Sequence, residues 1–478
     1  MKNIEFKVVT NSSCCAPTPT DCCSASENTE QSQSVGLSTE HAGLPVAIIG
    51  AGPIGLAAAA ELAVRNQKFI LFESGPKVGH NIREWGHVHL FSPWQYNIDK
   101  AARSLLLEQG WTAPSPDELP LGKEIVEQYL EPLAALPQIK PFVSFNSKVV
   151  AITRKNIDKM KSAGREKQPF VLYVEKEGRT ETIEARAVLD ASGTWGHPNP
   201  LNASGVWTKD EQSVQQHVFY GIPELTTANQ AKYKGKRVAV VGGGHSALNT
   251  LLDLVQLKEA DPRTELVWIM RKKRVEEAYG GEENDQLEAR GELGSRIHQL
   301  VNSGQIQVMT PFHIERLVKV GEQIQVSGAM NGEKMEISGI DHMIVNTGSR
   351  PDFSFLSEIR LNIDPATESV ETLAPLIDPN IHSCGTVRPH GQKELQHQEK
   401  DFYIVGMKSY GRAPTFLMAT GYEQVRSIAA YLAGDLEAAA KVELELPETG
   451  VCSANNVSIS AGDCCSAPVA PQPSSCCD

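Results

Sequence analysis

The sequence is poor in basic residues: 45 lysines and arginines stand against 58 aspartates and glutamates, giving a formal net charge of −13. This balance argues against non-specific nucleic-acid binding and against docking on an anionic membrane. The first residues contain no apolar run of the kind that a signal peptide needs. Residues 44–62 approach membrane-spanning length, but their glycines and Pro53 favour a buried strand, a tight turn and a buried helix. We therefore expect a cytoplasmic protein with neither nucleic acid nor membrane as a partner.

With 478 residues, of which 41% are hydrophobic, the chain is long enough for two or three domains. Residues 11–42 and 448–478 are rich in serine, threonine, proline, glutamine and cysteine without hydrophobic periodicity, as is typical of mobile tails. Between them, short apolar strands alternate with helical patterns, which predicts parallel α/β layers. Residues 305–338 differ, because short alternating segments separated by glycines predict a small antiparallel meander.

A first glycine-rich turn follows an apolar strand at residues 46–49 and precedes an alanine-rich helix. In this G-x-G-x-x-G pattern Gly50 allows the tight turn, Gly52 lets the backbone approach a pyrophosphate, and Gly55 allows close packing of helix on strand. The next strand, 69–72, is followed by Glu73, about 20 residues on, where a ribose hydroxyl needs an acceptor. This segment predicts a dinucleotide-binding fold.

A second turn of the G-x-G-x-x-A type begins at Gly242 and ends at Ala247. The strand after it, 265–270, ends in a run of four basic residues, 271–274, rather than in an acid. Such a cluster can bind a phosphate, so this fold is expected to prefer NADPH to NADH, unless the cluster is only a solvated basic patch. His245 lies inside the turn, where packing or a place beside the phosphate is favoured over a direct redox role.

The two turns resemble those of the two-dinucleotide-binding flavoproteins, and within them the flavin-containing monooxygenases. The resemblance covers about residues 45–434. Residues 185–196 are similar to the strand that leads from the FAD domain to the NADPH domain, and residues 341–351 to the matching return strand. Residues 402–407 and the helix expected at about 415–432 resemble the closing FAD segment, where the helix N-terminus favours negative charge on a reduced flavin.

The resemblance implies an α/β fold with two Rossmann-like three-layer domains, the NADPH domain being inserted into a discontinuous FAD domain. The expected boundaries are 1–43 for a flexible Cys-rich tail, 44–205 and 351–436 for the two parts of the FAD domain, 206–350 for the NADPH domain with its β-meander, and 437–478 for a second Cys-rich tail.

The residues expected at the cofactors follow from these motifs. Those predicted to bind FAD are Gly50, Gly52, Pro53, Ile54, Gly55, Glu73, Ser74, Trp85, Val149, Ala191, Ser192, Gly193, Gly406, Thr415 and Phe416. Those predicted to bind NADPH are Gly242, Gly243, Gly244, His245, Ser246, Ala247, Arg271, Lys272, Arg274, Thr347, Gly348 and Arg350.

Two departures from related patterns narrow the chemistry. Residues 217–223 keep only a loose version of the Phe-x-Gly and histidine pattern that monooxygenases of this kind place before the second glycine turn. Neither glycine turn carries a cysteine pair, and neither does the segment 75–94. Thioredoxin, glutathione and mercuric reductases need such a pair beside the flavin. These dithiol chemistries are therefore disfavoured, and direct flavin chemistry is expected.

Eight of the ten cysteines form adjacent pairs in the two tails. Neighbouring Cα atoms lie about 3.8 Å apart, which is short for a disulfide, and zinc sites prefer C-x₂-C spacing. Contiguous soft thiolates suit a thiophilic ion such as trivalent arsenic or antimony; another soft-metal or redox-buffer role, or no function, are the alternatives. The predicted ligands are Cys14, Cys15, Cys22, Cys23, Cys464, Cys465, Cys476 and Cys477.

Together, the cysteine pairs and the monooxygenase pattern resemble the flavin monooxygenases of bacterial arsenic and antimony resistance. The resemblance implies that NADPH reduces FAD, that dioxygen gives a flavin C4a-hydroperoxide, and that a trivalent metalloid is oxidised to the pentavalent form. Cys384 and His390 are candidate substrate ligands near the flavin, although a buried structural cysteine is the simpler reading of Cys384. The alternatives are a monooxygenase of an organic amine or thioether, and a non-enzymatic metalloid-binding flavoprotein.

Overall fold

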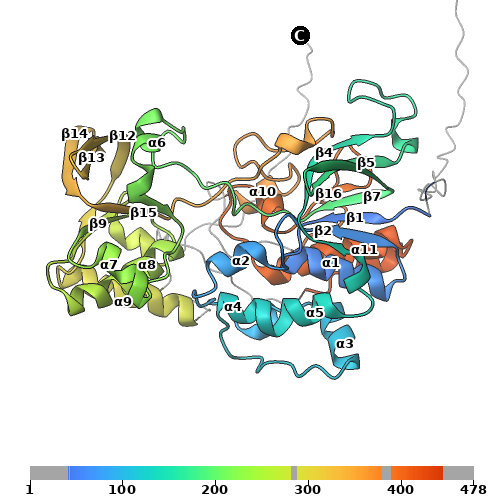
Figure 1. Ribbon diagram of the computed structural model, residues 1–478, viewed down its shortest axis with the longest axis horizontal. Helices are drawn as coiled ribbons and strands as arrows, with labels where there is room; N and C mark the ends of the chain where they lie inside the picture. The colour runs from blue at the N-terminus through green and yellow to red at the C-terminus, as the bar shows by residue number, and fades with distance from the viewer. Residues whose placement is uncertain (1–40, 42, 281, 283–287, 379–388, 445–478) are drawn as a thin grey trace, which may run out of the picture. The chain divides into compact units, whose positions relative to one another are not determined.

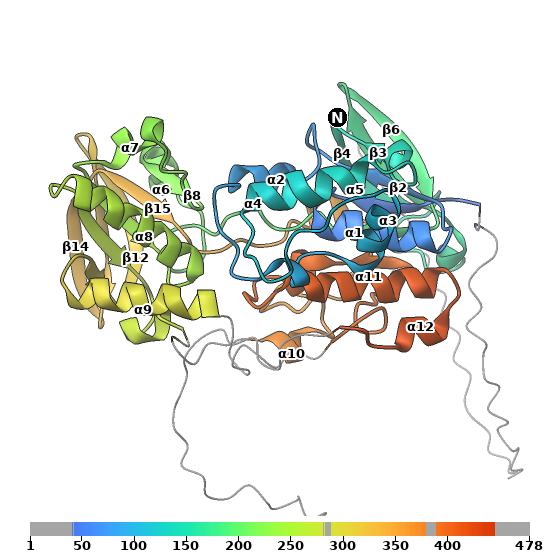
Figure 2. The same cartoon turned by 90° about the horizontal axis from the view of Figure 1, so that it is seen from below.

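The computed structural model describes residues 41, 43–280, 282, 288–378 and 389–444, and the following account concerns these residues (Figures 1 and 2). Two parallel five-stranded sheets and two antiparallel three-stranded sheets make up the strands of this part of the chain. No helix in these ranges is long and apolar enough to cross a membrane.

The first parallel sheet is built from two distant parts of the chain. Its strand order is β16-β7-β1-β2-β3, and every pairing is parallel. The residues of β1 are buried on both faces, which explains why they form a continuous apolar run rather than an alternating one. The strands are β1 (Val46–Ile49), β2 (Phe69–Phe72), β3 (Val143–Ser144), β7 (Ala187–Asp190) and β16 (Phe402–Ile404).

Two long helices cover this sheet and lie side by side in both ribbon views: α1 (Pro53–Val64) and α11 (Met418–Leu432). Residues 44–62, which approach membrane-spanning length, thus form the predicted buried strand β1, a turn and the buried helix α1. Most of α1 is alanine, leucine and glycine and is buried, because β1 and β2, α3 and α11 all pack against it. Shorter helices in this part are α2 (His80–Glu84), α3 (Lys100–Glu108), α4 (Gly122–Glu124), α5 (Glu131–Ala135), α10 (Ala374–Ile377) and α12 (Leu436–Ala440).

The second parallel sheet has the order β11-β10-β9-β15-β8. All of its residues fall between β7 and β16, which are neighbours in the first sheet. The second sheet is therefore inserted into the first along the chain, which confirms the predicted fold class. Its strands are β8 (Val218–Tyr220), β9 (Arg237–Val241), β10 (Glu265–Ile269), β11 (Gln307–Met309) and β15 (His342–Val345), and its helices are α6 (Lys209–Ser213), α7 (Thr227–Tyr233), α8 (His245–Ala260) and α9 (Glu288–Asn302).

The predicted meander is present, with one difference at its start. It consists of β12 (Phe312–Val320), β13 (Gln323–Met330) and β14 (Glu333–Ile340), all antiparallel. The strand β11, which lies inside the stretch predicted as meander, instead pairs in parallel with β10. The short length of β11 gave no pattern that would distinguish the two sheets.

A second antiparallel sheet was not predicted. It comprises β4 (Ser147–Arg154), β5 (Phe170–Lys176) and β6 (Arg179–Ala185). The hairpin between β5 and β6 turns at Glu177 and Gly178, which both have positive φ, as a two-residue turn of the primed type requires. The signal available in the sequence was the apolar run 170–174, which is followed, after two polar residues, by the turn residues Glu177 and Gly178.

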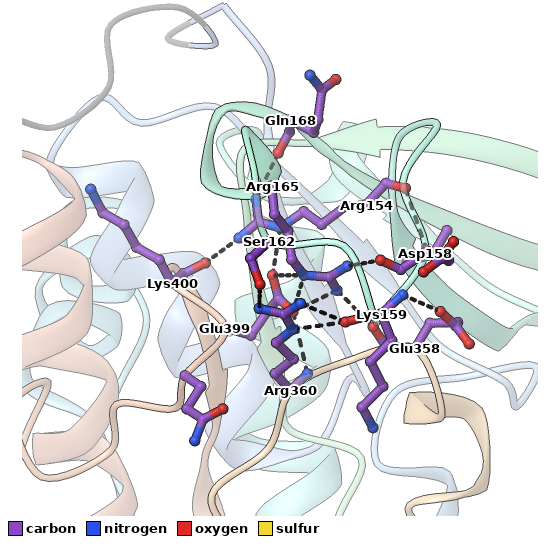
Figure 3. Close-up of polar contacts among 12 residues, drawn as sticks. Arg154, Asp158, Lys159, Ser162, Arg165, Gln168, Glu358, Arg360, Glu399 and Lys400 are labelled. Atoms are coloured by element: carbon purple, nitrogen blue, oxygen red, sulfur yellow. Dashed lines mark hydrogen bonds and ion pairs between the residues drawn. The ribbon is translucent and has the colours of Figure 1, made fainter. Parts of the chain in front are cut away.

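A buried ion cluster joins this sheet to the segment that precedes β16 (Figure 3). The carboxylate of Glu399 accepts from Arg154 Nε at 2.8 Å and from Arg165 Nη2 at 2.7 Å, and the three side chains are at most 5% exposed. Burial raises the pKa of Glu399, but the hydrogen bonds and charges of Arg165 and Arg154 outweigh it and hold the pKa below its usual range. Arg165 also donates to the carbonyls of Asp158 and Glu358. The cluster thus fixes three separate chain segments around one carboxylate.

Candidate cofactor and active site

The first glycine turn leaves an open face at the N-terminus of α1. Gly50 has φ +100, and a Cβ there would lie 2.7 Å from the carbonyl oxygen of Ala191, so glycine is required. At Gly55 a Cβ would lie 1.8 Å from Gly50 O, which is the predicted close packing of helix on turn. A Cβ on Gly52, in contrast, would meet no described heavy atom within 4 Å. Gly52 is the N-cap residue of α1 and has no side chain to cap it. The first backbone amides of the helix are therefore available to bind an anion.

Glu73 lies beside this turn. Its Oε2 accepts from the backbone N–H of Ala51 at 2.8 Å, and its Oε1 accepts from that of Gly75 at 2.7 Å. The side chain of Ser74 is 3.4 Å from the same Oε1. Each carboxylate oxygen has a second lone pair, so the group held here can still accept from a ribose hydroxyl. The structure therefore brings the predicted ribose acceptor to the predicted pyrophosphate turn.

The closing segment of the chain packs against the start of α1. Gly406 has φ +69, and a Cβ there would lie 3.1 Å from the side chain of Ile54. A Cβ on Gly421 would lie 2.5 Å from Ile54 and 2.8 Å from Phe416. The loop 191–193 approaches the same turn through Ala191. Three segments that are distant in sequence thus surround residues 50–55.

The polar groups at this place fit an FAD. The hydroxyl of Thr415, just before α11, is buried and has no hydrogen-bond partner among the described residues. Thr415 and Phe416 precede the N-terminus of α11, whose positive end is available to an electron-rich ring edge. An orphaned buried hydroxyl is costly unless a bound group satisfies it. The donor set and the open glycine turn therefore suit a cofactor with a pyrophosphate and a polar ring.

Two predicted FAD residues have their contacts elsewhere. Trp85 caps the C-terminus of α2 and packs on Gly122 and on the ring of Trp195, at 6.3 Å between ring centroids. Val149 lies in β4 opposite Val174. No described contact joins either side chain to the glycine turn, so their role at FAD stays a prediction.

The second turn repeats the geometry of the first. Gly242 has φ +137, and a Cβ there would lie 2.3 Å from the carbonyl oxygen of Asn346, which follows β15 as Ala191 follows β7. Gly244 has no described heavy atom within 4 Å of its Cβ position, and Ala247 is fully buried against the sheet. The helix α8 begins at His245 and has no side-chain cap. This is again an open helix N-terminus beside a glycine turn.

Of the basic residues after β10, Lys272 is the one that lies over this turn. Its Cε is 3.1 Å from the Cβ position of Gly243, and its ammonium donates to the carbonyl of Glu277. Arg271 donates to the carbonyl of Ala203 at 3.3 Å, and Arg274 lies 3.7 Å from Glu277. Lys272 and Arg274 thus both contact Glu277, whereas Arg271 contacts the segment at Ala203, and the role of these cations at NADPH stays a prediction.

Thr347, Gly348 and Arg350 are also predicted to bind NADPH. They lie in one of the two chain segments that connect the parallel sheets, and these two segments pair with each other as a short ribbon. The hydroxyl of Thr347 donates to Asn199 O at 2.8 Å, and the carbonyl of Gly348 accepts from Asn199 N–H at 2.9 Å. Arg350 pairs with Glu368. A cavity of about 240 Å³ beside the ribbon is lined by Gly196, His197, Pro198, Trp207, Arg350, Pro351 and Asp352.

Two further residues predicted for NADPH begin α8. His245 packs on the ring of Phe91, at 5.5 Å between centroids, and Ser246 O accepts from Thr250.

The catalytic and metal candidates are described only in part. His390 is 3% exposed, and its Nε2 lies 2.8 Å from the side-chain nitrogen of Gln424. The amide of Gln424 is held in turn by the backbone N–H of Gly406, which donates to its Oε1 at 2.7 Å. Cys384 and the eight paired cysteines lie outside the described residues. Within the described ranges, no group of three His, Cys, Asp or Glu side chains could hold a metal ion.

Sequence reasoning missed Lys408. Its ammonium lies 2.6 Å from Asp190 Oδ2 at the end of β7, and both side chains are completely buried. A lysine between an apolar strand and an apolar helix was the available signal, since a buried charge needs a partner.

Comparisons with known proteins agree with this architecture. The sequence model described as pyridine nucleotide-disulphide oxidoreductase matches residues 47–385. Ferredoxin–NADP reductase 2 of Latilactobacillus sakei is 25% identical over 349 residues, which are 73% of this chain and 86% of the relative. Ferredoxin–NADP reductase 1 of Bacillus licheniformis is 24% identical over 66% of this chain and 73% of the relative.

Solved structures show the same fold. Bacillithiol disulfide reductase of Bacillus cereus has a TM-score of 0.58 at 20% identity, over 82% of this chain and 99% of that one. The FAD-bound cadaverine monooxygenase of desferrioxamine biosynthesis from Erwinia amylovora has a TM-score of 0.59 at 14% identity, over 84% and 97%. The chain is thus similar both to reductases and to monooxygenases that share two dinucleotide-binding domains.

Proposed function

The chain belongs to the pyridine nucleotide-disulphide oxidoreductase family, and from this premise we propose that it is a monooxygenase that oxidises a trivalent metalloid. It is a flavin-dependent oxidoreductase that uses FAD and NADP(H). The observation that carries the choice of substrate is the placement of eight of the ten cysteines as four adjacent pairs. Contiguous soft thiolates favour arsenite, antimonite or a trivalent organoarsenical over harder ions.

On the NADPH side, we assign binding of the pyrophosphate to the turn 242–247 and the N-terminus of α8. We assign to Lys272, whose Cε lies over Gly243, the neutralisation of the 2′-phosphate that distinguishes NADPH from NADH. On the FAD side, the turn 50–55 and α1 receive the pyrophosphate, and Glu73 accepts from a ribose. We assign to the N-terminus of α11 the stabilisation of negative charge on the ring, since no side chain caps this helix.

When bound, FAD would supply the two-electron redox chemistry that links NADPH to dioxygen. The overall reaction balances: NADPH and a proton would provide two electrons and two protons, one oxygen atom would go to the metalloid, whose oxidation state rises from three to five, and the other would leave as water with NADP⁺. The protein contributes binding, orientation and exclusion of water around these reactants. This division of labour explains why the proposal requires no nucleophilic triad.

An organic amine is the second candidate substrate. The observation that favours it is the structural similarity to the cadaverine monooxygenase of Erwinia amylovora and to ornithine N-hydroxylase of Kutzneria, the latter with a TM-score of 0.53 at 16% identity. In that case the paired cysteines would protect the enzyme from metals rather than deliver a substrate. The names of the sequence relatives favour a third outcome, electron transfer from NADPH to an external acceptor without oxygen insertion.

The test is NADPH oxidation by the purified, FAD-loaded protein in air, with antimonite, a trivalent arsenical, cadaverine or ornithine supplied in turn. We expect the metalloids to stimulate NADPH consumption and to yield the pentavalent product in a one-to-one ratio. Stimulation by an amine alone, with a hydroxylated product, would establish the second candidate. Consumption that gives only hydrogen peroxide, whatever is added, would contradict the monooxygenase proposal.

A further inference from the structure

A completely buried ion pair lies at the carboxyl end of β7. Lys408 Nζ donates to Asp190 Oδ2 at 2.6 Å and to Ser192 Oγ at 3.1 Å. The second oxygen of Asp190 accepts from the backbone N–H of Ser192 at 3.1 Å and from its hydroxyl at 2.6 Å. The ammonium also lies over the ring of Phe355, 4.5 Å from its centroid. We call Lys408, Asp190 and Ser192 the Lys408 clamp.

The clamp joins the two segments that border the first glycine turn. Asp190 and Ser192 flank Ala191, whose carbonyl oxygen is 2.7 Å from the Cβ position of Gly50. Lys408 belongs to the short 3-10 helix Gly406–Tyr410, whose first residue packs on Ile54 at the start of α1. The turn 50–55 is therefore held from one side by the loop 191–193 and from the other by Gly406. The side chain of Lys408 connects these two sides.

Stability alone does not account for this arrangement. Taking a lysine and an aspartate out of water carries a large desolvation penalty, and apolar or neutral replacements of buried ion pairs are often as stable or more so. A buried pair held by four defined hydrogen bonds does supply a single geometry, because any other arrangement leaves a charge unpaired. At the carboxyl edge of a parallel sheet, the groups whose geometry matters are those that surround the ligand.

We propose that Lys408 is a positioning residue for FAD. By holding the loop 191–193 and the closing segment in a fixed relation, it keeps the turn 50–55 open to the cofactor before FAD arrives. The inference rests on the FAD site of the proposed function but not on the identity of the oxidised substrate.

The test uses full-length double variants in which both charges are removed together, so that no buried charge is left unpaired. Lys408→Met/Asp190→Asn removes the charges and the hydrogen bonds of the lysine. Lys408→Gln/Asp190→Asn removes the charges but retains polar partners. The Kd for FAD is measured by titrating each apoprotein, and the thermal unfolding midpoint of the same apoprotein is measured separately. Lys155→Met, which breaks a half-exposed pair with Glu184, is the matched control.

We expect the first double variant to bind FAD at least about tenfold more weakly, a change of about 1.4 kcal/mol, with an apoprotein midpoint like that of the wild type. The Gln-containing variant should recover part of the loss, and the Lys155 control should bind FAD normally. A wild-type Kd in both double variants would overturn the proposal. So would a Kd that rises only together with a fall in the apoprotein midpoint, or a failure to fold, because the clamp would then be structural. None of these readouts depends on metalloid oxidation.

Discussion

Gly50 and Gly242 occupy equivalent places in their two sheets, and in both cases the neighbouring strand explains the glycine. A Cβ would lie 2.7 Å from Ala191 O at the first site and 2.3 Å from Asn346 O at the second, closer than real contacts of this kind. Both residues also have φ in the range that only glycine adopts freely. The sequence predicted the tight turns, but it could not identify the carbonyl groups that make them obligatory, because those come from strands far along the chain.

Lys272 is the single residue on which the preference for NADPH is expected to depend. Replacing it with alanine removes a cationic side chain whose Cε lies 3.1 Å from the Cβ position of Gly243, while its neighbour Lys273 is exposed. Loss of a hydrogen bond to a charged group typically weakens binding by about 10- to 100-fold. We therefore expect Lys272→Ala to raise the KM for NADPH by about this factor and to leave the KM for NADH nearly unchanged. Steady-state kinetics with both nucleotides measure this.

Lys273→Ala serves as the control for a general loss of positive charge. It should change the KM for NADPH by much less than Lys272→Ala does. Equal effects of the two substitutions would indicate a diffuse basic patch, which is the alternative that the sequence left open.

Asp99 makes stability depend on pH. It caps α3 by accepting from the N–H of Ala102 at 2.8 Å, and burial followed by the charge of Glu61 raises the pKa of Asp99 to about 8. Because an aspartate in an unfolded chain titrates near about 3.9, the folded protein binds the extra proton between these two pH values. This group therefore lowers the unfolding free energy progressively as the pH rises from about 4 to about 8.

The substitution Asp99→Asn should remove this dependence, because asparagine caps a helix as well as aspartate does and cannot ionise. We expect the variant to unfold at nearly the same temperature as the wild type at pH 4 and at a higher temperature at pH 9. Asp99→Ala is the control, since it also cannot ionise but loses the cap, and it should be about 1 kcal/mol less stable than the Asn variant at either pH. Identical midpoints of the Asn variant and the wild type at pH 9 would show that the carboxyl group ionises without cost.

At the scale of elements, the sequence predicted those strands and helices that carry a motif. The strands 46–49 and 69–72 agree with the prediction to the residue, because the glycine turn and Glu73 mark their ends. The sheet of β4, β5 and β6 was not predicted. No asparagine–glycine pair marks the turn between β5 and β6, and a long connection separates β4 from β5. The Lys408 clamp was missed for a similar reason: it depends on a contact between residues 218 positions apart.

The ion cluster of Glu399 holds the long connection between β4 and β5. A single substitution at Glu399 is therefore expected to lower the unfolding free energy strongly. Glu399→Gln leaves the guanidinium groups of Arg154 and Arg165 buried without their carboxylate. Breaking a buried pair from one side typically costs about 3–5 kcal/mol. We expect a loss of this size in the unfolding free energy, measured as a shift of the urea midpoint.

The control for this change is Asp210→Asn, which breaks a pair of similar length with Arg316 on the surface. Such exposed pairs contribute less than about 1 kcal/mol, so the urea midpoint should hardly move. A shift no larger in Glu399→Gln than in Asp210→Asn would show that water or another acidic group compensates the two arginines.

At the scale of the whole molecule, the insertion of one sheet into another was predicted from the resemblance to the two-dinucleotide-binding flavoproteins. The resemblance was sufficient because residues 402–407 match the closing FAD segment, and these residues form β16, which pairs with β7. The position of the substrate could not be predicted in the same way. Its candidate ligands are cysteines, and none of them falls in a motif that fixes its place relative to a strand or a helix.

The distribution of cysteine between the tails and the folded part leads to the last prediction. If the paired thiolates capture a metalloid and hand it to the flavin site, they raise its local concentration, which matters only when the metalloid is scarce. Replacing the eight paired cysteines with serine in the full chain should therefore raise the KM for antimonite by about tenfold or more, while kcat stays close to that of the wild type. FAD content and the KM for NADPH should not change, because neither cofactor turn contains a cysteine.

Cys384→Ser separates capture from a role at the reacting atoms. As the candidate ligand in the chain segment next to His390, it should lower kcat if it holds the metalloid during oxidation, and it should leave both constants unchanged if it is a structural cysteine. An unchanged KM in the eight-serine protein would instead show that the tails do not deliver the substrate. The metalloid would then have to reach the flavin site by direct diffusion, and the cysteine pairs would act, if at all, as a separate thiol reserve.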